Sequence, residues 1–280
     1  MMVIIMKART RRRNAICAGI ILLFSLWTII PIFMMFSQAI KPERLMFTDP
    51  PTLLFIPTLE HFISIFSRNN IFLNIVNSSI VGLATMVLCI VLGSLCAYAL
   101  ARIHIPGVRI IALLILITRM IPVSSLMMPM YVMMRKIGVS GSYFAVILAH
   151  TTLNLPFAII MMKGFFQDIP LELEEAAQVD GCSRFHAFLR VCLPLTGPGL
   201  ATTSIMVLLN SWNEFMFALI LSGRTTRTLP VGISSFLGSV SIDWGASSAA
   251  ASLATIPIFI AGIFIQKYFV RGLTGGAVKG

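Results

Sequence analysis

Long apolar blocks alternate with short polar connectors along almost the whole chain. Each block has roughly 20 residues or more, the length that a helix needs to cross the hydrocarbon core of a bilayer. The pattern therefore predicts an all-α polytopic membrane protein. The six expected transmembrane helices are 15–37, 73–100, 109–131, 143–163, 198–221 and 246–268.

The first apolar block follows a basic stretch that contains Lys7, Arg9 and Arg11. Basic residues before an apolar core are also typical of a signal peptide, and Ser37-Gln38-Ala39 offers a weak cleavage site. The core of a signal peptide is usually shorter, about 7–15 residues. We therefore interpret 15–37 as an uncleaved transmembrane helix.

The composition supports a membrane protein. Only 11% of the residues are charged and 58% are hydrophobic, with a mean hydropathy of +0.94, whereas soluble domains carry about 25% charged residues. The net charge of +11 is spread between apolar blocks, without a basic face interleaved with aromatic residues. A nucleic-acid partner is therefore not expected.

The distribution of Lys and Arg predicts the orientation, because cytoplasmic connectors carry the excess of these residues. With both termini inside, 13 of them lie on the inner side and 7 on the outer side, although Arg135 and Lys136 run against the rule. The expected segments are a cytoplasmic tail (1–14), the first transmembrane helix (15–37), a periplasmic connector (38–72), a five-helix core (73–268) that contains a cytoplasmic insert (164–197), and a cytoplasmic tail (269–280).

The periplasmic connector, rich in proline and aromatic residues, is expected to be irregular with a short interfacial helix. Within the core, small residues recur four apart at Ser78 and Gly82 and again at Gly93 and Ala97, a spacing that lets helix backbones approach closely. Prolines inside the spans are expected to kink or break them. These are Pro122, Pro129, Pro156 and Pro257.

The cytoplasmic insert begins with a predicted short helix. Pro170 can open it, since the first turn needs no proline N–H. Glu172, Glu174 and Glu175 follow, where acids suit the positive end of the helix dipole. Gly181 is expected to end the helix, because glycine tolerates the left-handed cap.

A second short helix is predicted after Ser183, which can cap its start. Apolar residues then recur at helical spacing, and Pro194 and Pro198 are expected to stop the helix before the fifth span. The segment could be a self-folded loop or a docking element for a partner. The apolar stripe consists of Phe185, Phe188, Leu189 and Cys192.

The residues of this insert resemble the "EAA…G…LP" loop of ABC importer permease subunits. The resemblance extends to the carbohydrate-uptake, maltose-permease-like branch and covers nearly the whole chain. The matching stretches are Glu175-Ala176-Ala177, Asp180-Gly181, Leu193-Pro194, "RMIPVSSLMMPMY" (119–131), "SWNEFMFAL" (211–219), "TLPVGI" (228–233) and "QKYFVRGLTGGAVKG" (266–280).

The resemblance implies the ABC type I importer permease fold and a multi-pass location in the bacterial inner membrane. It also implies an ATPase dimer that binds the insert and supplies ATP and Mg²⁺, a second permease subunit of a different chain, a periplasmic or lipid-anchored substrate-binding protein, and a sugar or polyol as cargo. The C-terminal tail would reach the ATPase too. The residues implied to contact the ATPase or shape the loop are Glu175, Ala176, Ala177, Asp180, Gly181, Leu193 and Pro194.

Motifs for chemistry within the chain itself are missing from the sequence. It has no Gly-Lys dipeptide, and therefore no phosphate-binding loop of the Walker A type. Its five cysteines form no CxxC pair, and its four histidines lie far apart. We therefore expect a transport subunit rather than an enzyme, with no metal and no cofactor of its own.

Polar residues within the expected spans have two interpretations. Charged groups at membrane depth usually face the interior of a bundle. Arg119, Asn210, Asn213 and Glu214 could therefore line the translocation path, or they could form a structural network, for example between Arg119 and Glu214.

Two other classes of protein were weighed. A secondary transporter or channel driven by an ion gradient would use acidic residues in its spans, but it would leave the EAA-like insert unexplained. A membrane enzyme would need a nucleophile and a base at matching depth, and His150 has no evident partner in the sequence.

Overall fold

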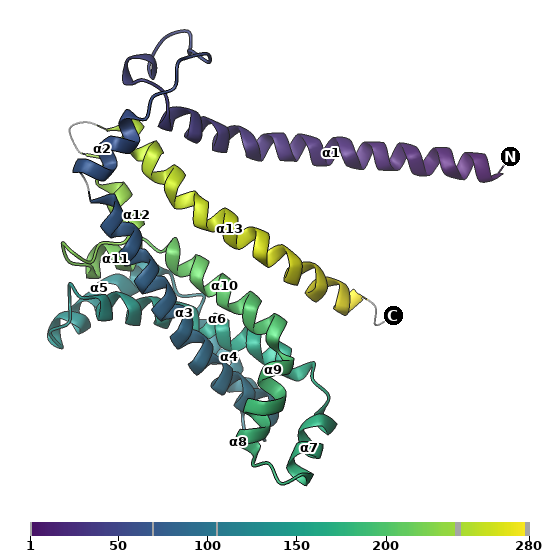
Figure 1. Cartoon of the computed structure of the whole chain (residues 1–280). Coiled ribbons are helices and arrows are strands. Elements are labelled where there is room, and N and C mark those ends of the chain that lie inside the picture. The colour runs from purple at the N-terminus through teal and green to yellow at the C-terminus, as the bar shows by residue number, and fades with distance from the viewer. Residues whose placement is uncertain (1, 69, 105, 239–241, 278–280) are drawn as a thin grey trace. The chain divides into compact units, whose positions relative to one another are not determined.

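The computed structural model describes residues 2–68, 70–104, 106–238 and 242–277 (Figure 1). Within this part of the chain the regular elements are all helices, and β-bridges occur only in isolation. The chain divides into two compact units. Unit 1 comprises Met1–Asn69 and Phe236–Leu253, and unit 2 comprises Asn70–Ser235 and Ala254–Gly280.

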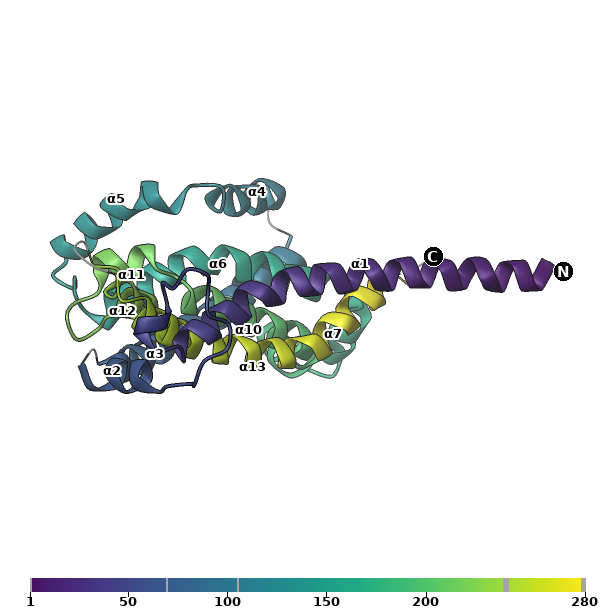
Figure 2. The same ribbon diagram turned by 90° about the horizontal axis from the view of Figure 1, so that it is seen from above.

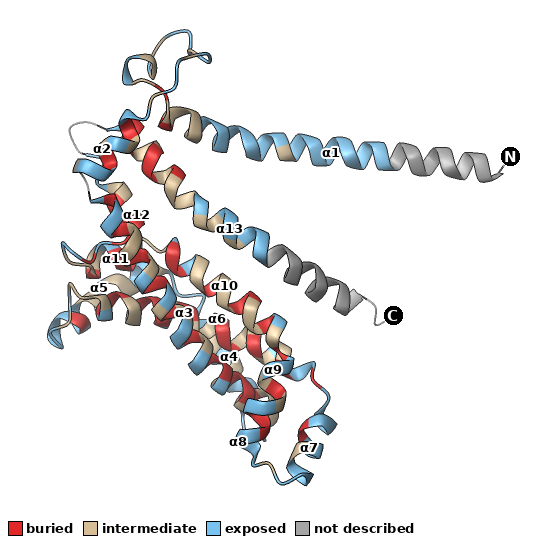
Figure 3. Cartoon of the chain, viewed as in Figure 1, coloured by how far each residue is buried: buried red, intermediate tan, exposed pale blue. Residues whose placement is uncertain are grey.

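Unit 1 contains α1 (Met2–Ala39), a 3₁₀ turn (Glu43–Leu45) and the short helix α2 (Glu60–Arg68). It also contains the start of α13 (Trp244–Ala277), which continues into unit 2. Most of the described side chains of α1 are exposed (Figure 3). The short helix expected in the outer connector is present as α2.

The connector of unit 1 is ordered by a few specific contacts. The amide of Thr58 donates to the carbonyl of Ile40 at 2.8 Å, and the buried ring of His61 contacts the carbonyl of Lys41 at 2.9 Å. Gly245 lies so close that a Cβ atom there would come within 2.2 Å of the His61 ring. These contacts hold an irregular segment in one conformation.

Unit 2 is built on three long helices: α3 (Ile71–Arg102), α6 (Tyr143–Gln167) and α10 (Gly197–Trp212). These helices carry most of the buried residues of the unit (Figure 3). Smaller elements occupy both ends of α3. α5, α11 and α12 gather near its start, and α7 and α8 lie near its end (Figure 1).

Small residues allow the long helices to approach closely, as their spacing predicted. A Cβ atom added to Gly93 of α3 would lie 3.0 Å from the Cβ atom of Ala158 on α6. One added to Gly82 would lie 2.9 Å from the side chain of Leu208 on α10. A larger residue at either position would therefore force a neighbouring group to shift.

The third expected span, 109–131, is not one helix. It consists of α4 (Val108–Thr118) and α5 (Val123–Lys136), which are bent by 93° at the residues between them. The physical reason is Pro122, because its ring disfavours a helical conformation in the preceding residue. The bent segment lies along one side of the bundle, where α4 contacts α6 (Figure 2).

The other three prolines lie inside continuous helices. Pro129 is in α5, Pro156 in α6 and Pro257 in α13. The expectation of a kink or a break is therefore confirmed for Pro122, while the other three prolines do not break their helices.

The fifth expected span, 198–221, is also interrupted. α10 ends at Trp212, and the separate helix α11 (Met216–Leu221) begins after three residues. Sixteen residues reach only about 24 Å, less than the hydrocarbon core. The interruption places Asn213 and Glu214 at the end of a helix, where their side chains can bond to backbone groups.

The insert forms α7 (Leu171–Val179), α8 (Arg184–Ala187), a π-helical turn (Phe188–Cys192) and α9 (Leu193–Leu195). Gly181 has φ +89°, and the hydroxyl of Ser183 accepts from the amide of His186, so both predicted caps are confirmed. The helical segment continues through Pro194 and ends at Leu195, between Pro194 and Pro198, so it stops before the fifth span as predicted. The wider π turn makes room for a proline ring, which in a regular helix clashes with the carbonyl four residues earlier.

The opposite end of unit 2 is closed by α12 (Leu229–Ser234) and by the loop that precedes it. The buried Asn77 side chain donates to the carbonyls of Thr225 and Arg227 at 2.9 and 2.8 Å and accepts from Tyr143 at 2.6 Å. One side chain of α3 thus fixes the loop between α11 and α12.

By length and composition, four described helices could each cross a membrane, or up to six segments if each bent pair counts as one span. The four single helices are Asn14–Ala39, Ile71–Arg102, Tyr143–Gln167 and Trp244–Phe264. The other two candidates are α4 with α5 and the segment Arg184–Leu195 with α10. The predicted helical, multi-pass character is confirmed, while the number of spans and the orientation stay predictions.

Candidate functional site

The insert packs its inner side against the ends of α3 and α6. Tyr98 of α3 lies with its ring centroid 4.7 Å from that of Phe188 and 5.8 Å from that of Phe166. Phe188 and Cys192 are buried, whereas Phe185 and Leu189 of the same predicted stripe are exposed. The stripe is thus divided between the core of unit 2 and the surface.

Glu174 is the buried acid of α7, with 2% of its surface exposed, while Glu172 and Glu175 are exposed. All three acids suit the start of a helix, so their positions alone did not predict which of them is buried. Adjacent residues of a helix point in directions about 100° apart. Glu174 can therefore face the bundle while Glu175 faces away from it. Only the position of Tyr98 and Arg102, about 70 residues earlier, could have revealed its role.

The residues predicted to contact an ATPase lie at the surface of the insert. Glu175, Ala176, Asp180 and Gly181 are exposed, and Ala177 is partly buried. Farther along, Leu193 is partly buried, and Pro194 is exposed in α9. The EAA-like motif is therefore accessible on a helix whose opposite side is anchored.

Apolar side chains extend this accessible surface. Val179 is 87% exposed, at the end of α7. In water, such a cluster of exposed apolar residues marks a surface that binds a partner. The large exposed apolar residues of α7, α8 and the π turn are Leu171, Leu173, Val179, Phe185 and Leu189.

A cavity of about 420 Å³ lies between α4, α5, α6 and the end of α10 in unit 2. Arg119, Asn210 and Glu214, three of the four residues predicted to line a translocation path, line it together with Asn154. Asn213 is not among the described residues that line it. Its amide instead donates to the carbonyl of Leu209 at 2.9 Å.

Glu214 uses both carboxylate oxygens within the protein. Oε1 accepts from the amide of Phe217 at 2.9 Å, and Oε2 accepts from the amide of Ala218 at 3.1 Å. Oε2 also lies 2.9 Å from Nε2 of His150. Glu214 therefore caps the start of α11, and its position in the cavity follows from this structural task.

His150 is fully buried, and its other ring nitrogen lies 2.7 Å from the hydroxyl of Ser211. His150, for which no partner was expected, therefore has two, Glu214 and Ser211, which the sequence does not reveal because they lie about 60 residues later in the chain. Trp212 is buried, and its indole N–H donates to the carbonyl of Ala254 at 3.1 Å.

Arg119 ends α4 at the break before Pro122. Its guanidinium carbon lies 5.2 Å from the ring centroid of Phe157, a cation–π contact. The suggested pair of Arg119 with Glu214 is not formed. Arg119 contacts Phe157 instead, and Glu214 pairs with His150. Arg119 also lines the cavity, where a guanidinium group can donate hydrogen bonds.

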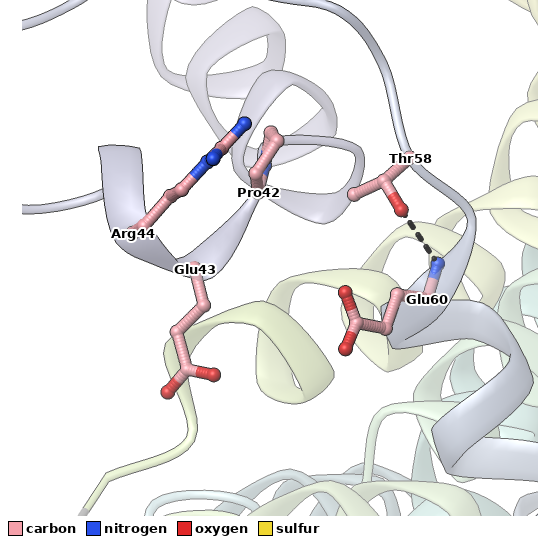
Figure 4. A pocket seen from close by; sticks show the side chains of 5 residues that line it. All are labelled: Pro42, Glu43, Arg44, Thr58 and Glu60. Atoms are coloured by element: carbon pink, nitrogen blue, oxygen red, sulfur yellow. Dashed lines mark hydrogen bonds between the residues drawn. The ribbon is translucent and has the colours of Figure 1, made fainter.

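Unit 1 has a hollow of its own, of about 590 Å³, lined by Pro42, Glu43, Arg44, Thr58 and Glu60 (Figure 4). The hydroxyl of Thr58 accepts from the amide of Glu60 at 3.2 Å. The hollow is open and belongs to the irregular connector. Among the described residues, no group of three or more His, Cys, Asp or Glu side chains is arranged to hold a metal ion.

Comparison with known protein families gives one match. Residues 90–275 match the model of the binding-protein-dependent transport system inner membrane component. The matched range covers two thirds of the chain and includes the insert and the cavity.

Two relatives cover almost the whole chain. The permease protein of the sulfoquinovosyl glycerol transport system of Agrobacterium fabrum is 36% identical over 267 residues, which cover 95% of this chain and 93% of the relative. The trehalose transport system permease protein of Mycobacterium tuberculosis is 36% identical over 258 residues, which cover 91% of this chain and 93% of the relative.

A solved structure with the same fold is that of a bacterial ABC transporter involved in the import of the acidic polysaccharide alginate. The TM-score is 0.78 at 21% sequence identity, and the alignment covers 92% of this chain and 97% of the other. The fold that the EAA-like resemblance implied, that of an ABC importer permease, is confirmed.

Proposed function

We propose that this chain, which belongs to the family of inner membrane components of binding-protein-dependent transport systems, carries a carbohydrate or a related polyol through the membrane. Membership of the family makes it a multi-pass permease subunit and not an enzyme. The relatives described above are permease proteins for a sulfoquinovosyl glycerol and for trehalose, which supports a carbohydrate as the substrate class.

The observation that carries the coupling role is the two-sided insert. One side of α7 and of the π turn is fixed to α3 and α6, and the other side exposes Glu175, Ala176 and Asp180 with several apolar residues. A short helix that is anchored on one side and bound by a moving partner on the other can transmit that movement. We infer that the partner is a cytoplasmic ATPase dimer, which binds ATP and Mg²⁺ and drives transport.

The cavity of unit 2 supports a role in translocation. It brings Arg119 and Asn210 together at the break between α4 and α5, with hydrogen-bond donors of the kind that a polyhydroxylated substrate accepts. Asn213 lies at the end of the same helix as Asn210, at the surface of the chain. A second permease subunit would cover that surface, and a substrate-binding protein would deliver the cargo from outside.

Transport driven by an ion gradient has no support among the relatives. Glu214, the acidic residue that such a mechanism would use, has both oxygens engaged by His150 and by backbone amides. Uptake into vesicles that contain the assembled transporter should therefore require ATP inside and should continue when the ion gradient is dissipated.

The coupling role is tested by Glu175→Lys in the complete transporter. We expect loss of the ATPase from the purified complex and loss of uptake, because the change places a cation on the docking surface. Asp168→Lys is the matched control, since Asp168 is an exposed acid at the end of α6, outside the proposed docking surface. Normal uptake together with normal recovery of the ATPase by Glu175→Lys would refute the proposed docking surface.

A further inference from the structure

The inner side of α7 is fixed by one carboxylate. Tyr98 donates its hydroxyl to Oε1 of Glu174, and Nε of Arg102 lies 3.2 Å from Oε2. The thiol of Cys192 donates to Oε2 at 3.5 Å. Three segments of the chain, α3, α7 and the π turn, thus meet at Glu174.

Arg102 makes a second contact that strengthens the same junction. One of its terminal nitrogens donates to the carbonyl of Ile169 at 2.6 Å, directly before α7 begins. Arg102 therefore binds the chain at the entrance of α7 and again one turn inside it. Two attachment points fix the direction of a helix, whereas one would let it pivot.

Burial makes this junction difficult to open. The side chains of Arg102 and Glu174 are only 9% and 2% exposed. Separating a buried ion pair leaves a charge without compensation in a medium of low dielectric constant. The pair therefore resists a change in the position of α7 relative to α3.

The two attachment points on α3 also share one face. Tyr98 and Arg102 are four residues apart, which places them on the same side of the helix. Both lie in its last turns, so a displacement of α7 acts directly on the end of α3. Packing of Tyr98 against Phe188 and Phe166 adds an apolar surround to the polar contacts.

We propose that Glu174 is a positioning residue that joins α7 to the end of α3, so that a movement imposed on the exposed side of α7 moves α3 with it. This inference rests on the proposed coupling of the insert to an ATPase. Glu175 and Glu174 then have different tasks on adjacent positions: Glu175 faces the partner, and Glu174 passes the movement to the membrane helices.

The test uses Glu174→Gln in the complete, reconstituted transporter. Glutamine keeps the size of the side chain and can still accept from Tyr98, but it removes the charge that pairs with Arg102. We expect the ATPase to remain bound and active while the amount transported per ATP hydrolysed falls about tenfold, within the usual range of coupling between sites. Glu172→Gln is the control and should leave this ratio unchanged.

Tyr98→Phe provides a second variant that keeps the aromatic packing. It should lower the same ratio by a smaller factor. When it is added to Glu174→Gln, the further loss should be smaller than the loss that Tyr98→Phe causes alone, because both residues act through one junction. A ratio in Glu174→Asp close to that of the unmodified protein would support the charge of residue 174 as the cause.

The inference is wrong if Glu174→Gln transports normally per ATP, or if its only effect is a lower melting temperature or loss of the ATPase. Independent, fully additive losses in the double variant would also overturn it. Glu175→Lys, measured in parallel, separates this failure from that of the proposed function: unimpaired docking in Glu175→Lys contradicts the coupling surface itself, whereas normal transport per ATP in Glu174→Gln alone contradicts only the junction.

Discussion

Two carboxylates of unit 2 are satisfied in different ways. Glu174, at the insert end, is bound by side chains of a helix about 70 residues earlier in the chain. Glu214, at the cavity end, is bound mainly by the backbone of the helix that it starts, with His150 as the partner from another helix. The first arrangement joins distant elements, and the second fixes a local break.

The difference shows why one acid suits the transmission of movement and the other suits the shape of a cavity. A carboxylate held by its own helix moves with that helix, so it exerts little force on its neighbours. A carboxylate held by another helix must either carry that helix along or lose its partners. Three substitutions measure this contrast, and they follow in order of expected effect.

The largest effect is expected from Arg102→Ala. It leaves Glu174 buried without its cationic partner, which should lower the free energy of unfolding by about 3–5 kcal/mol. Thermal unfolding of the purified complex measures the change, and Arg190→Ala, at an exposed position of the π turn, is the control. A loss no greater than that of the control would show that Glu174 does not need the pair.

A smaller effect is expected from Glu214→Ala. It removes the acceptor for two amides of α11 and for His150, and an unsatisfied buried polar group costs about 1–3 kcal/mol. The loss should stay confined to α11, which hydrogen exchange of residues 216–221 can detect. Asn213→Ala serves as the control, and equal exchange in both variants would argue against the cap.

The smallest effect on stability is expected from Arg119→Ala. The cation–π contact with Phe157 contributes about 0.5–1 kcal/mol at an exposed site, so the melting temperature should change little. Uptake should nevertheless fall if the cavity lies on the translocation path, whereas Arg109→Ala, at the start of α4, should transport normally. Unchanged uptake by Arg119→Ala would remove this residue from the path.

Much of the fold could be predicted from hydropathy, because α3 and α6 are long, continuous and apolar. The interruptions at 119–122 and 213–215 could not be placed in the same way, since three or four residues hardly change the mean hydropathy of a span. Pro122 gave a local signal for the first of them. Nothing comparable precedes Glu214, whose capping role depends on the backbone that follows it.

The candidate site was predictable where it depends on local sequence and not where it depends on tertiary contacts. The caps at Gly181 and Ser183 and the exposure of Glu175 follow from positions within the insert. The burial of Glu174 and the pairing of His150 depend on residues about 60 to 75 positions away, and a single sequence does not show which distant side chains will meet.

The close approach of α3 and α6 at Gly93 limits how the protein can change shape. A methyl group at Gly93 would lie only 3.0 Å from the Cβ atom of Ala158, so the two helices pack closely at this point. Close packing along α3 and α6 favours movement of the two helices together. The breaks at residues 119–122 and 213–215 are places where backbone torsions can change without disrupting a long helix.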